Sequence, residues 1–88
     1  MPSRVQLVPP PYEPDPALAA AIRELRDASR RSQEAIAHEV GLTVGSYARI
    51  ERGLSNPTWT TVRRIARAFD LTIAELAAVA QRHDTRHG

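Results

Sequence analysis

Two short segments with a helical pattern are separated by only three residues, and this spacing constrains the fold more than any other feature. The first segment, SQEAIAHEV, has apolar residues at Ile36 and Val40, and the second, which runs to Gly53, has them at Tyr47 and Ile50. Helices joined so closely must cross at a steep angle. The pattern therefore predicts two crossed helices that share one apolar contact.

The residues around the turn suit such a crossing. Ala37 is small where the second helix would pass close to the first, and Gly41 tolerates the positive φ that ends a helix. Ser32 and Thr43 are suited to cap the two N-termini. The shared apolar set would be Ile36, Val40, Leu42, Tyr47 and Ile50. We expect a helix-turn-helix unit over residues 33–50.

One helix is expected before this unit. Leu18, Ile22 and Leu25 recur at the spacing of one helix face from Ala17 onward, and the pattern fades near residues 29–31. Residues 1–16 hold six of the seven prolines, including three in a row. We therefore expect a flexible, extended arm over residues 1–16, before a packed domain over residues 17–80.

Two helices are expected after the unit. Thr58 would cap the first and Asp70 would end it, with Trp59 as an anchor in the core. Thr72 and Glu75 form a T-x-x-E capping box for the second. The buried face of the first would be Trp59, Val62, Ile65, Ala66 and Phe69, and that of the second Ile73, Leu76 and Ala77. The prediction is an all-α, compact five-helix domain, with residues 81–88 as a polar tail.

Composition excludes several classes of function. Cysteine is absent, which excludes disulfides, zinc–cysteine sites and thiol catalysis. The apolar runs fall short of the roughly 20 residues of a membrane helix, and the first residues lack the apolar core of a signal peptide. No nucleophile has a base and an orienting group, and no phosphate loop occurs. We expect a cytoplasmic protein without catalytic residues, cofactors or a membrane partner.

The net charge and the histidines give little information about function. The net charge is only +2, but all twelve basic residues are arginine, which can bind phosphate or guanine with two hydrogen bonds. A GC-rich genome is the preferred explanation of this bias, because arginine and alanine codons are rich in G and C. In the tail, His83 and His87 flank Asp84, but a third strong ligand is missing, so no metal site is expected.

The segment RSQEAIAHEVGLTVGSYARIERGLSNPTWTTVRRIARAFDLTIAEL resembles the lambda-repressor/Cro-like (XRE) helix-turn-helix DNA-binding family. SQEAIA, the G-L-T turn, RIERG, NP-T and FDLTIAEL occur in order and with the family's loop lengths, and the resemblance covers roughly residues 17–80. It implies five helices with the third in the major groove of double-stranded DNA. It also implies a transcriptional regulator, most often a repressor, that binds a two-fold symmetric operator as a homodimer.

The resemblance also implies roles for individual residues. Arg49 would determine specificity, because arginine can donate two hydrogen bonds to guanine. Arg26 and Glu51 match an ion pair that joins the first and third helices. The residues that would face base edges are Thr43, Val44, Gly45, Ser46 and Arg49. The residues that would contact phosphates are Gln33, Tyr47, Arg52, Ser55, Asn56 and Thr58.

The chain departs from the family's common pattern in three places. Val44 and Gly45 replace polar residues at the start of the third helix, so more weight falls on Arg49, on close backbone approach and on DNA shape. Tyr47 replaces an aliphatic residue, and its ring would fill the core while its hydroxyl reached a phosphate. Asp70 stands where glycine is common.

Two other functions stay open at this point. The protein could be an antitoxin that binds a partner protein through the N-terminal arm or the C-terminal tail and represses its own operon. It could also be a domain that has lost DNA binding and serves as a protein-interaction module. A co-purifying partner would indicate the first, and an Arg49→Ala variant with unchanged function would indicate the second.

Overall fold

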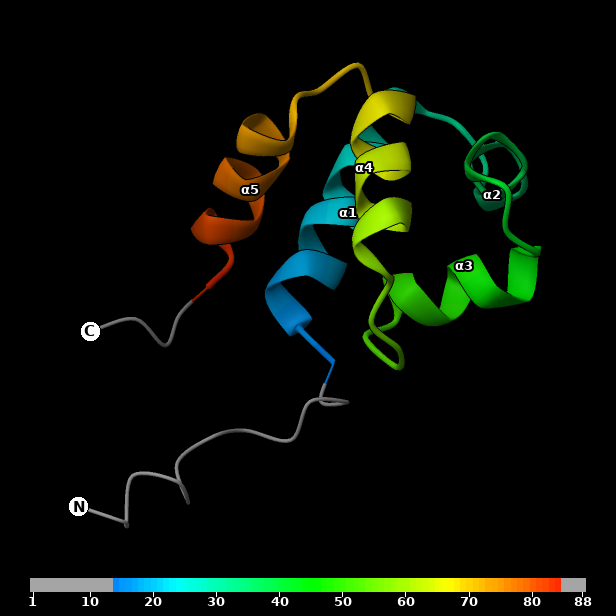
Figure 1. Ribbon diagram of the computed structural model, residues 1–88, viewed down its shortest axis with the longest axis horizontal. Coiled ribbons are helices and arrows are strands. Elements are labelled where there is room, and N and C mark those ends of the chain that lie inside the picture. The colour runs from blue at the N-terminus through cyan, green and yellow to red at the C-terminus, as the bar shows by residue number, and fades with distance from the viewer. Residues whose placement is uncertain (1–13, 85–88) are drawn as a thin grey trace, which may run out of the picture.

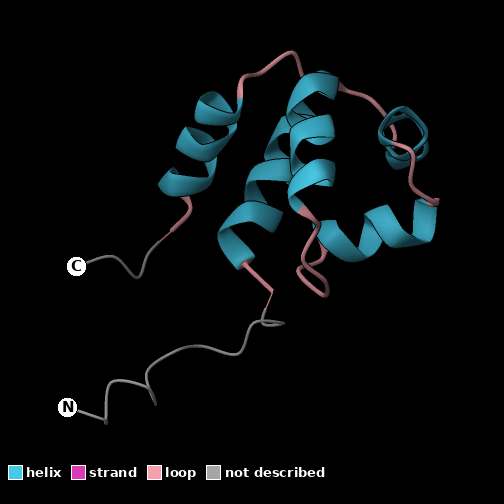
Figure 2. Cartoon of the chain, in the orientation of Figure 1, coloured by secondary structure: helices cyan, strands magenta, loops and turns pink. Residues whose placement is uncertain are grey.

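The computed structural model describes residues 14–84, which contain five α-helices and no strand (Figures 1 and 2). The helices are α1 (Pro16–Ser29), α2 (Gln33–Val40), α3 (Val44–Glu51), α4 (Trp59–Ala68) and α5 (Ile73–Arg82). The predicted all-α, five-helix fold is confirmed. Residues 1–13 of the expected arm and residues 85–88 of the expected tail lie outside the described residues. Within the described part, α1 begins at Pro16 and α5 extends to Arg82.

Every helix begins at a residue whose side chain caps it. These side chains accept hydrogen bonds from backbone N–H groups of the first turn, which have no acceptor within the helix. The capping box of Thr72 and Glu75 is also present. The caps are Asp15, Ser32, Thr43, Thr58 and Thr72. The last four match the prediction, and the cap at Asp15 was not predicted.

The turn between α2 and α3 depends on Gly41. Its φ is 79°, and its N–H donates to the carbonyl of His38 at 3.2 Å. The next N–H, of Leu42, donates to the carbonyl of Ala37 at 2.9 Å. This pair of bonds is a Schellman motif, which ends a helix where a residue adopts the left-handed conformation. The chain therefore turns within three residues, and α3 crosses α2 at a steep angle, as the spacing predicted (Figure 1).

Two helices end in the left-handed conformation without a glycine. Arg30 follows α1 with a φ of 63°, and Asp70 follows α4 with a φ of 59°. An L-residue in this conformation brings its Cβ close to the following carbonyl oxygen, at a cost of roughly 1–2 kcal/mol. Aspartate tolerates it better than most residues, because its short polar side chain can bond locally. This conformation explains why glycine is common at the position of Asp70.

The core lies between α1, α2, α3 and α4. In Figure 1, α1 and α4 occupy the middle of the domain, with α2 and α3 on one side and α5 on the other. The helix α5 packs against α1 and α4 and buries Leu76 there. The buried cluster consists of Ile22, Ile36, Ala37, Val40, Tyr47, Ile50, Ile65 and Ala68.

Two residues predicted to be buried are exposed. The side chain of Trp59 is 62% exposed, so its prediction as a core anchor is wrong. Ala77 is exposed as well. Both residues line the groove between α4 and α5, which stays open because α5 packs mainly on α1. Within residues 14–84, no helix has both the length and the apolar character that crossing a membrane requires.

Candidate nucleic-acid interface

The outer face of α3 is open to solvent. Its first turn and the residue that caps it are exposed, and Val44 exposes 41% of its surface. Arg49, one turn further along, is exposed too. The five residues expected to face base edges, Thr43, Val44, Gly45, Ser46 and Arg49, therefore share one accessible surface, which we call the α3 outer face.

The opposite face of α3 is fixed in the core. Tyr47 is 0% exposed and Ile50 is 6% exposed. Burial raises the pKa of Tyr47, and the neighbouring carboxylate of Glu51 raises it further. Within the described residues, the Tyr47 hydroxyl is the one buried side-chain polar atom that lacks a hydrogen bond. The hydroxyl lies beside the carboxylate of Glu51 and has no accessible surface, so the expected phosphate contact of Tyr47 does not fit this structure.

Arg49 has no acidic partner among residues 14–84. One contact holds it, a hydrogen bond from Nη2 to the carbonyl of Leu54 at 3.5 Å, which is at the limit of such bonds. Most of the donors of its guanidinium group are therefore available. A planar donor group of this kind matches guanine O6 and N7, or a phosphate.

Gly45 leaves the backbone at the start of α3 without a covering side chain. A Cβ built on Gly45 would have no atom within 4 Å, so the helix does not need glycine for packing. The helix N-terminus is secured instead by Thr43, whose Oγ1 accepts from the N–H of Ser46 at 3.0 Å. The absence of a side chain allows a ligand to approach the backbone more closely at this point.

Gln33, the first residue of α2, is half-buried and bonded to α3. Its Nε2 donates to Oε1 of Glu51 at 2.9 Å. One amide hydrogen is thus engaged, and the second and the carbonyl oxygen can meet another ligand. The N–H groups of the first turn of α2 add a positive end of the helix dipole, although the exposed Glu34 opposes an anion there.

The loop between α3 and α4 holds the other expected phosphate contacts. Arg52 is exposed and Ser55 is half-buried. Asn56 accepts a hydrogen bond from the N–H of Asp15 at 2.8 Å through Oδ1. Thr58 accepts from the N–H of Thr61 at 3.1 Å and caps α4. Asn56 and Thr58 therefore have structural bonds, and Arg52 is the cation of this loop that is accessible.

The ion pair expected between Arg26 and Glu51 is present in the structure. Nε of Arg26 lies 2.6 Å from Oε2 of Glu51, and Nη2 lies 3.3 Å from Oε1. Burial raises the pKa of Glu51, but hydrogen bonds, first of all from Arg26, outweigh it and hold that pKa below its ordinary value. The bond to Glu51 also raises the pKa of Arg26. This pair joins α1 to the last residue of α3.

Three contacts that hold the end of α3 and the loop after it were not predicted from the sequence. Arg23 donates from Nη1 to the carbonyl of Glu51. Gln33 donates to the carboxylate of the same residue. Asn56 holds the start of α1 through Asp15. All three join residues at least 18 positions apart, and no local pattern specifies such pairs.

The tail residue His83 bonds to a neighbouring helix. Its Nε2 lies 2.6 Å from Oε1 of Glu24 in α1. Residues 14–84 contain no cluster of three or more histidine, cysteine or acidic side chains that could hold a metal. His87, the other histidine weighed as a ligand, lies outside the described residues.

Comparison with known proteins identifies the family. A family model described as a helix-turn-helix domain matches residues 17–79. The chain belongs to this helix-turn-helix family, of the lambda-repressor-like class. The predicted resemblance is therefore confirmed.

Individual proteins resemble the chain in sequence or in structure. The cryptic phage CTXphi transcriptional repressor RstR of Vibrio cholerae is 32% identical over 60 residues, which cover 68% of this chain and 54% of that protein. The chain thus matches about half the length of this relative. The restriction-modification controller protein C.AhdI of Aeromonas hydrophila is 33% identical with a TM-score of 0.66, over 69% of this chain and 92% of that one.

The fold extends to more distant structures. The clp gene regulator ClgR of Corynebacterium glutamicum has a TM-score of 0.74 over 80% of this chain and 77% of that one, at 22% identity. At this identity the similarity concerns the fold alone. The two structures thus share a fold over most of both chains.

Proposed function

We propose that this protein is a sequence-specific regulator of transcription that binds double-stranded DNA and represses promoters by covering them. The observation that supports this most is the α3 outer face, which is exposed along its length while Tyr47 and Ile50 fix the opposite face in the core. A rigid helix with an exposed outer face fits the major groove of B-DNA. Two similar proteins support the same function, because one is named a transcriptional repressor and the other a controller protein.

Sequence would be recognised mainly through Arg49. Its guanidinium group can donate two hydrogen bonds to a guanine, a contact that contributes roughly 1–3 kcal/mol of discrimination. Val44 can contact a thymine methyl group, and Thr43 and Ser46 offer hydroxyl groups. At Gly45 the helix backbone would approach the bases directly, and the shape of the DNA would contribute there.

Phosphate contacts would orient the domain on the duplex. The free amide hydrogen of Gln33 and the N-terminus of α2 would bind one phosphate. Arg52 and Ser55 would bind the backbone on the other side of α3. Asn56 and Thr58 keep their structural bonds and would contribute through the loop that they hold.

The protein would act as a homodimer in the cytoplasm, where the promoters are. A two-fold symmetric dimer would place its two α3 helices in successive major grooves, on half-sites about 10–10.5 base pairs apart. An operator bound in this way across a promoter would exclude RNA polymerase. The regulated promoter would then contain a symmetric site with one guanine per half-site opposite Arg49.

The test is selection of binding sites from random double-stranded DNA with the purified protein, followed by a salt titration of the selected site. We expect a two-fold symmetric sequence and a log–log salt slope of about −0.9 for each phosphate contact. Weak, salt-sensitive binding without an enriched sequence would indicate a regulator that needs a partner protein, such as an antitoxin. No binding at any salt concentration would show that the α3 outer face meets protein instead of DNA.

A further inference from the structure

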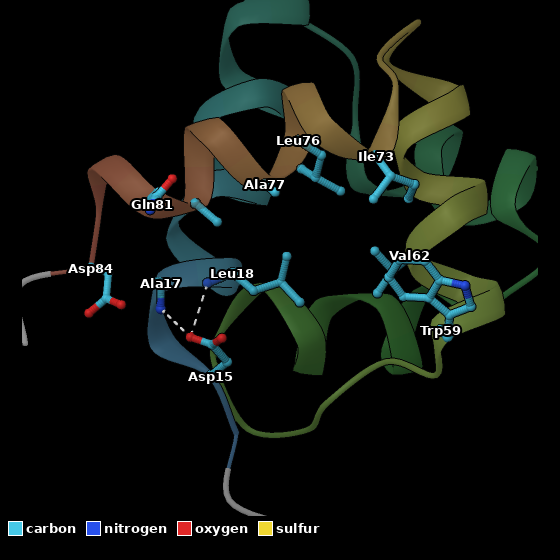
Figure 3. A pocket seen from close by; sticks show the side chains of 11 residues that line it. Asp15, Ala17, Leu18, Trp59, Val62, Ile73, Leu76, Ala77, Gln81 and Asp84 are labelled. Atoms are coloured by element: carbon cyan, nitrogen blue, oxygen red, sulfur yellow. Dashed lines mark hydrogen bonds between the residues drawn. The ribbon is translucent and has the colours of Figure 1, made fainter. Parts of the chain in front are cut away.

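An apolar groove lies between α1, α4 and α5, on the side of the domain away from α2 and α3 (Figures 1 and 3). Its volume is about 430 Å³. Leu18 lies in the middle, between Val62 and Trp59 of α4 and the apolar residues of α5 (Figure 3). Asp15 and Asp84 stand at the other end from Trp59. An apolar surface with polar residues at its rim is the usual form of an interaction site.

Trp59 is the unusual member of this groove. It is the only tryptophan of the chain, and 62% of its surface is exposed. A tryptophan that packs against a partner buries a large apolar area, roughly 150–250 Å². The exposed side chain of Trp59 does not obtain this burial from residues 14–84. The groove therefore lacks an apolar partner among these residues.

The chain itself contains a segment of matching chemistry. Residues 5–12 read VQLVPPPY, with three aliphatic side chains, three consecutive prolines and a tyrosine. Proline-rich segments favour the polyproline II conformation, and they bind grooves lined by aromatic residues with little loss of conformational entropy. This segment precedes residues 17–79, which match the family model, so its pairing with the groove would be a property of this chain.

The chain also enters the domain beside the groove. Asp15 lines one end, and its carboxylate accepts from the N–H groups of Ala17 and Leu18 at 2.9 and 3.4 Å. The N–H of Asp15 donates to Asn56, three residues before Trp59. Residue 15 is therefore fixed at the groove, and only two residues separate it from Tyr12. An extended segment of eight residues spans about 25 Å, at roughly 3.1 Å per residue.

We propose that residues 5–12 bind in the groove between α1, α4 and α5 of the same chain and cover Trp59. A short tether gives the segment an effective concentration on the order of millimolar, so a weak intrinsic affinity suffices. A second copy or a free partner would have to displace a segment that is always present. The proposal does not depend on DNA binding.

The test uses the emission of Trp59 in the full-length chain. The triple variant Val5→Ser, Leu7→Ser, Val8→Ser removes the aliphatic side chains of the segment. We expect its tryptophan emission to shift to longer wavelength and its quenching by acrylamide to increase, with unchanged helix content by circular dichroism. The double variant Arg4→Ser, Gln6→Ser changes the same stretch without removing apolar groups and should keep the original emission. Identical emission and quenching in the triple variant and the unchanged protein would overturn the proposal.

Nuclear Overhauser effects identify the occupant directly. We expect contacts between the indole protons of Trp59 and the methyl groups of Leu7 or Val8 within one chain. In a mixture of isotope-labelled and unlabelled protein, contacts that arise only between the two kinds of chain would show that a second copy fills the groove. A shift of the Trp59 emission on dilution, with a molecular mass that falls from dimer to monomer, would also show that a second copy fills the groove. Either result would overturn binding within the chain.

Discussion

Nε2 of Gln33 donates to Oε1 of Glu51 at 2.9 Å, and this bond joins the first residue of α2 to the last residue of α3. Arg26 of α1 binds the same carboxylate. The buried side chain of Glu51 thus connects Gln33, which is proposed to bind a phosphate, with α3, which is proposed to enter the major groove of DNA. The orientation of α2 relative to α3 depends on it, which makes the pair of Arg26 and Glu51 a target for testing stability.

Removing Arg26 should destabilise the domain strongly. The carboxylate of Glu51 is 2% exposed, so Arg26→Ala would leave a buried charge without its main partner, at a cost of about 3–5 kcal/mol. The double variant Arg26→Met, Glu51→Leu removes both charges and should cost less than the single variant. Chemical denaturation measures both. A double variant that is less stable than Arg26→Ala would contradict this account.

The stability of the domain should depend on pH through Glu51. Its pKa is lowered in the folded state, so the stabilisation is present above the ordinary value of 4.5 and is lost as the pH falls through the folded-state pKa. Denaturation of the unchanged protein and of Glu51→Gln should give free energies of unfolding that converge below pH 4.5. The pKa of Glu24 is also lowered, chiefly by its hydrogen bond with His83. Glu24 is present in both proteins, so its contribution cancels in the difference between their free energies of unfolding. A difference that stays constant between neutral and acidic pH would exclude this role of Glu51.

Replacing Arg30 by glycine should stabilise the domain. Arg30 adopts a φ of 63° after α1, and glycine adopts this conformation without the steric cost. The gain should be about 1 kcal/mol, reduced in part by the larger entropy of glycine in the unfolded chain, and 1 kcal/mol would raise the melting temperature by roughly 4–8 °C. The control is Arg30→Ala, which removes the same side chain but keeps a Cβ. Equal melting temperatures for the two variants would show that the left-handed conformation carries no strain here.

Local signals allowed most of the fold to be predicted. Ser32, Thr43 and Thr58 cap the helices that their positions indicated, and Gly41 ends α2 in the left-handed conformation. Such features depend on residues within one turn of each other, so the sequence specifies them directly. The pairing of Arg26 with Glu51 spans 25 residues and was expected only because the chain resembles a known family.

Features that depend on how helices pack were harder to predict. Trp59 lies on the apolar face of α4, but its burial depends on where α5 lies, and periodicity does not contain that information. Likewise, the depth of Tyr47 in the core decides whether its hydroxyl reaches the surface. The bond from Gln33 to Glu51 depends on the crossing of α2 and α3 and on the choice of side-chain rotamers.

Replacing Gly45 by alanine should separate stability from DNA binding. Its Cβ would meet no atom within 4 Å, so the variant should gain up to about 1 kcal/mol of helix propensity. If the backbone of α3 approaches the bases at Gly45, the same methyl group should weaken binding to the selected operator. The control is Arg30→Gly, which should also raise the melting temperature but lies at the end of α1, outside the α3 outer face. Unchanged affinity in Gly45→Ala would show that the backbone does not approach the DNA at this residue.

Arg49 and Arg52 should differ in what they contribute to DNA binding. Both are exposed, but Arg49 lies on the α3 outer face and Arg52 follows the end of the helix. Arg49→Ala should relax the preference for guanine at one position of each half-site, with a loss of roughly 1–3 kcal/mol on the selected operator. Arg52→Ala should weaken binding to all sequences alike and reduce the log–log salt slope by about 1 for each half-site. Affinities for the operator and for its single-base variants, measured at several salt concentrations, distinguish the two effects. A uniform loss in Arg49→Ala, with the guanine preference intact, would place Arg49 on a phosphate and leave the recognition of the bases to Val44 and the backbone at Gly45.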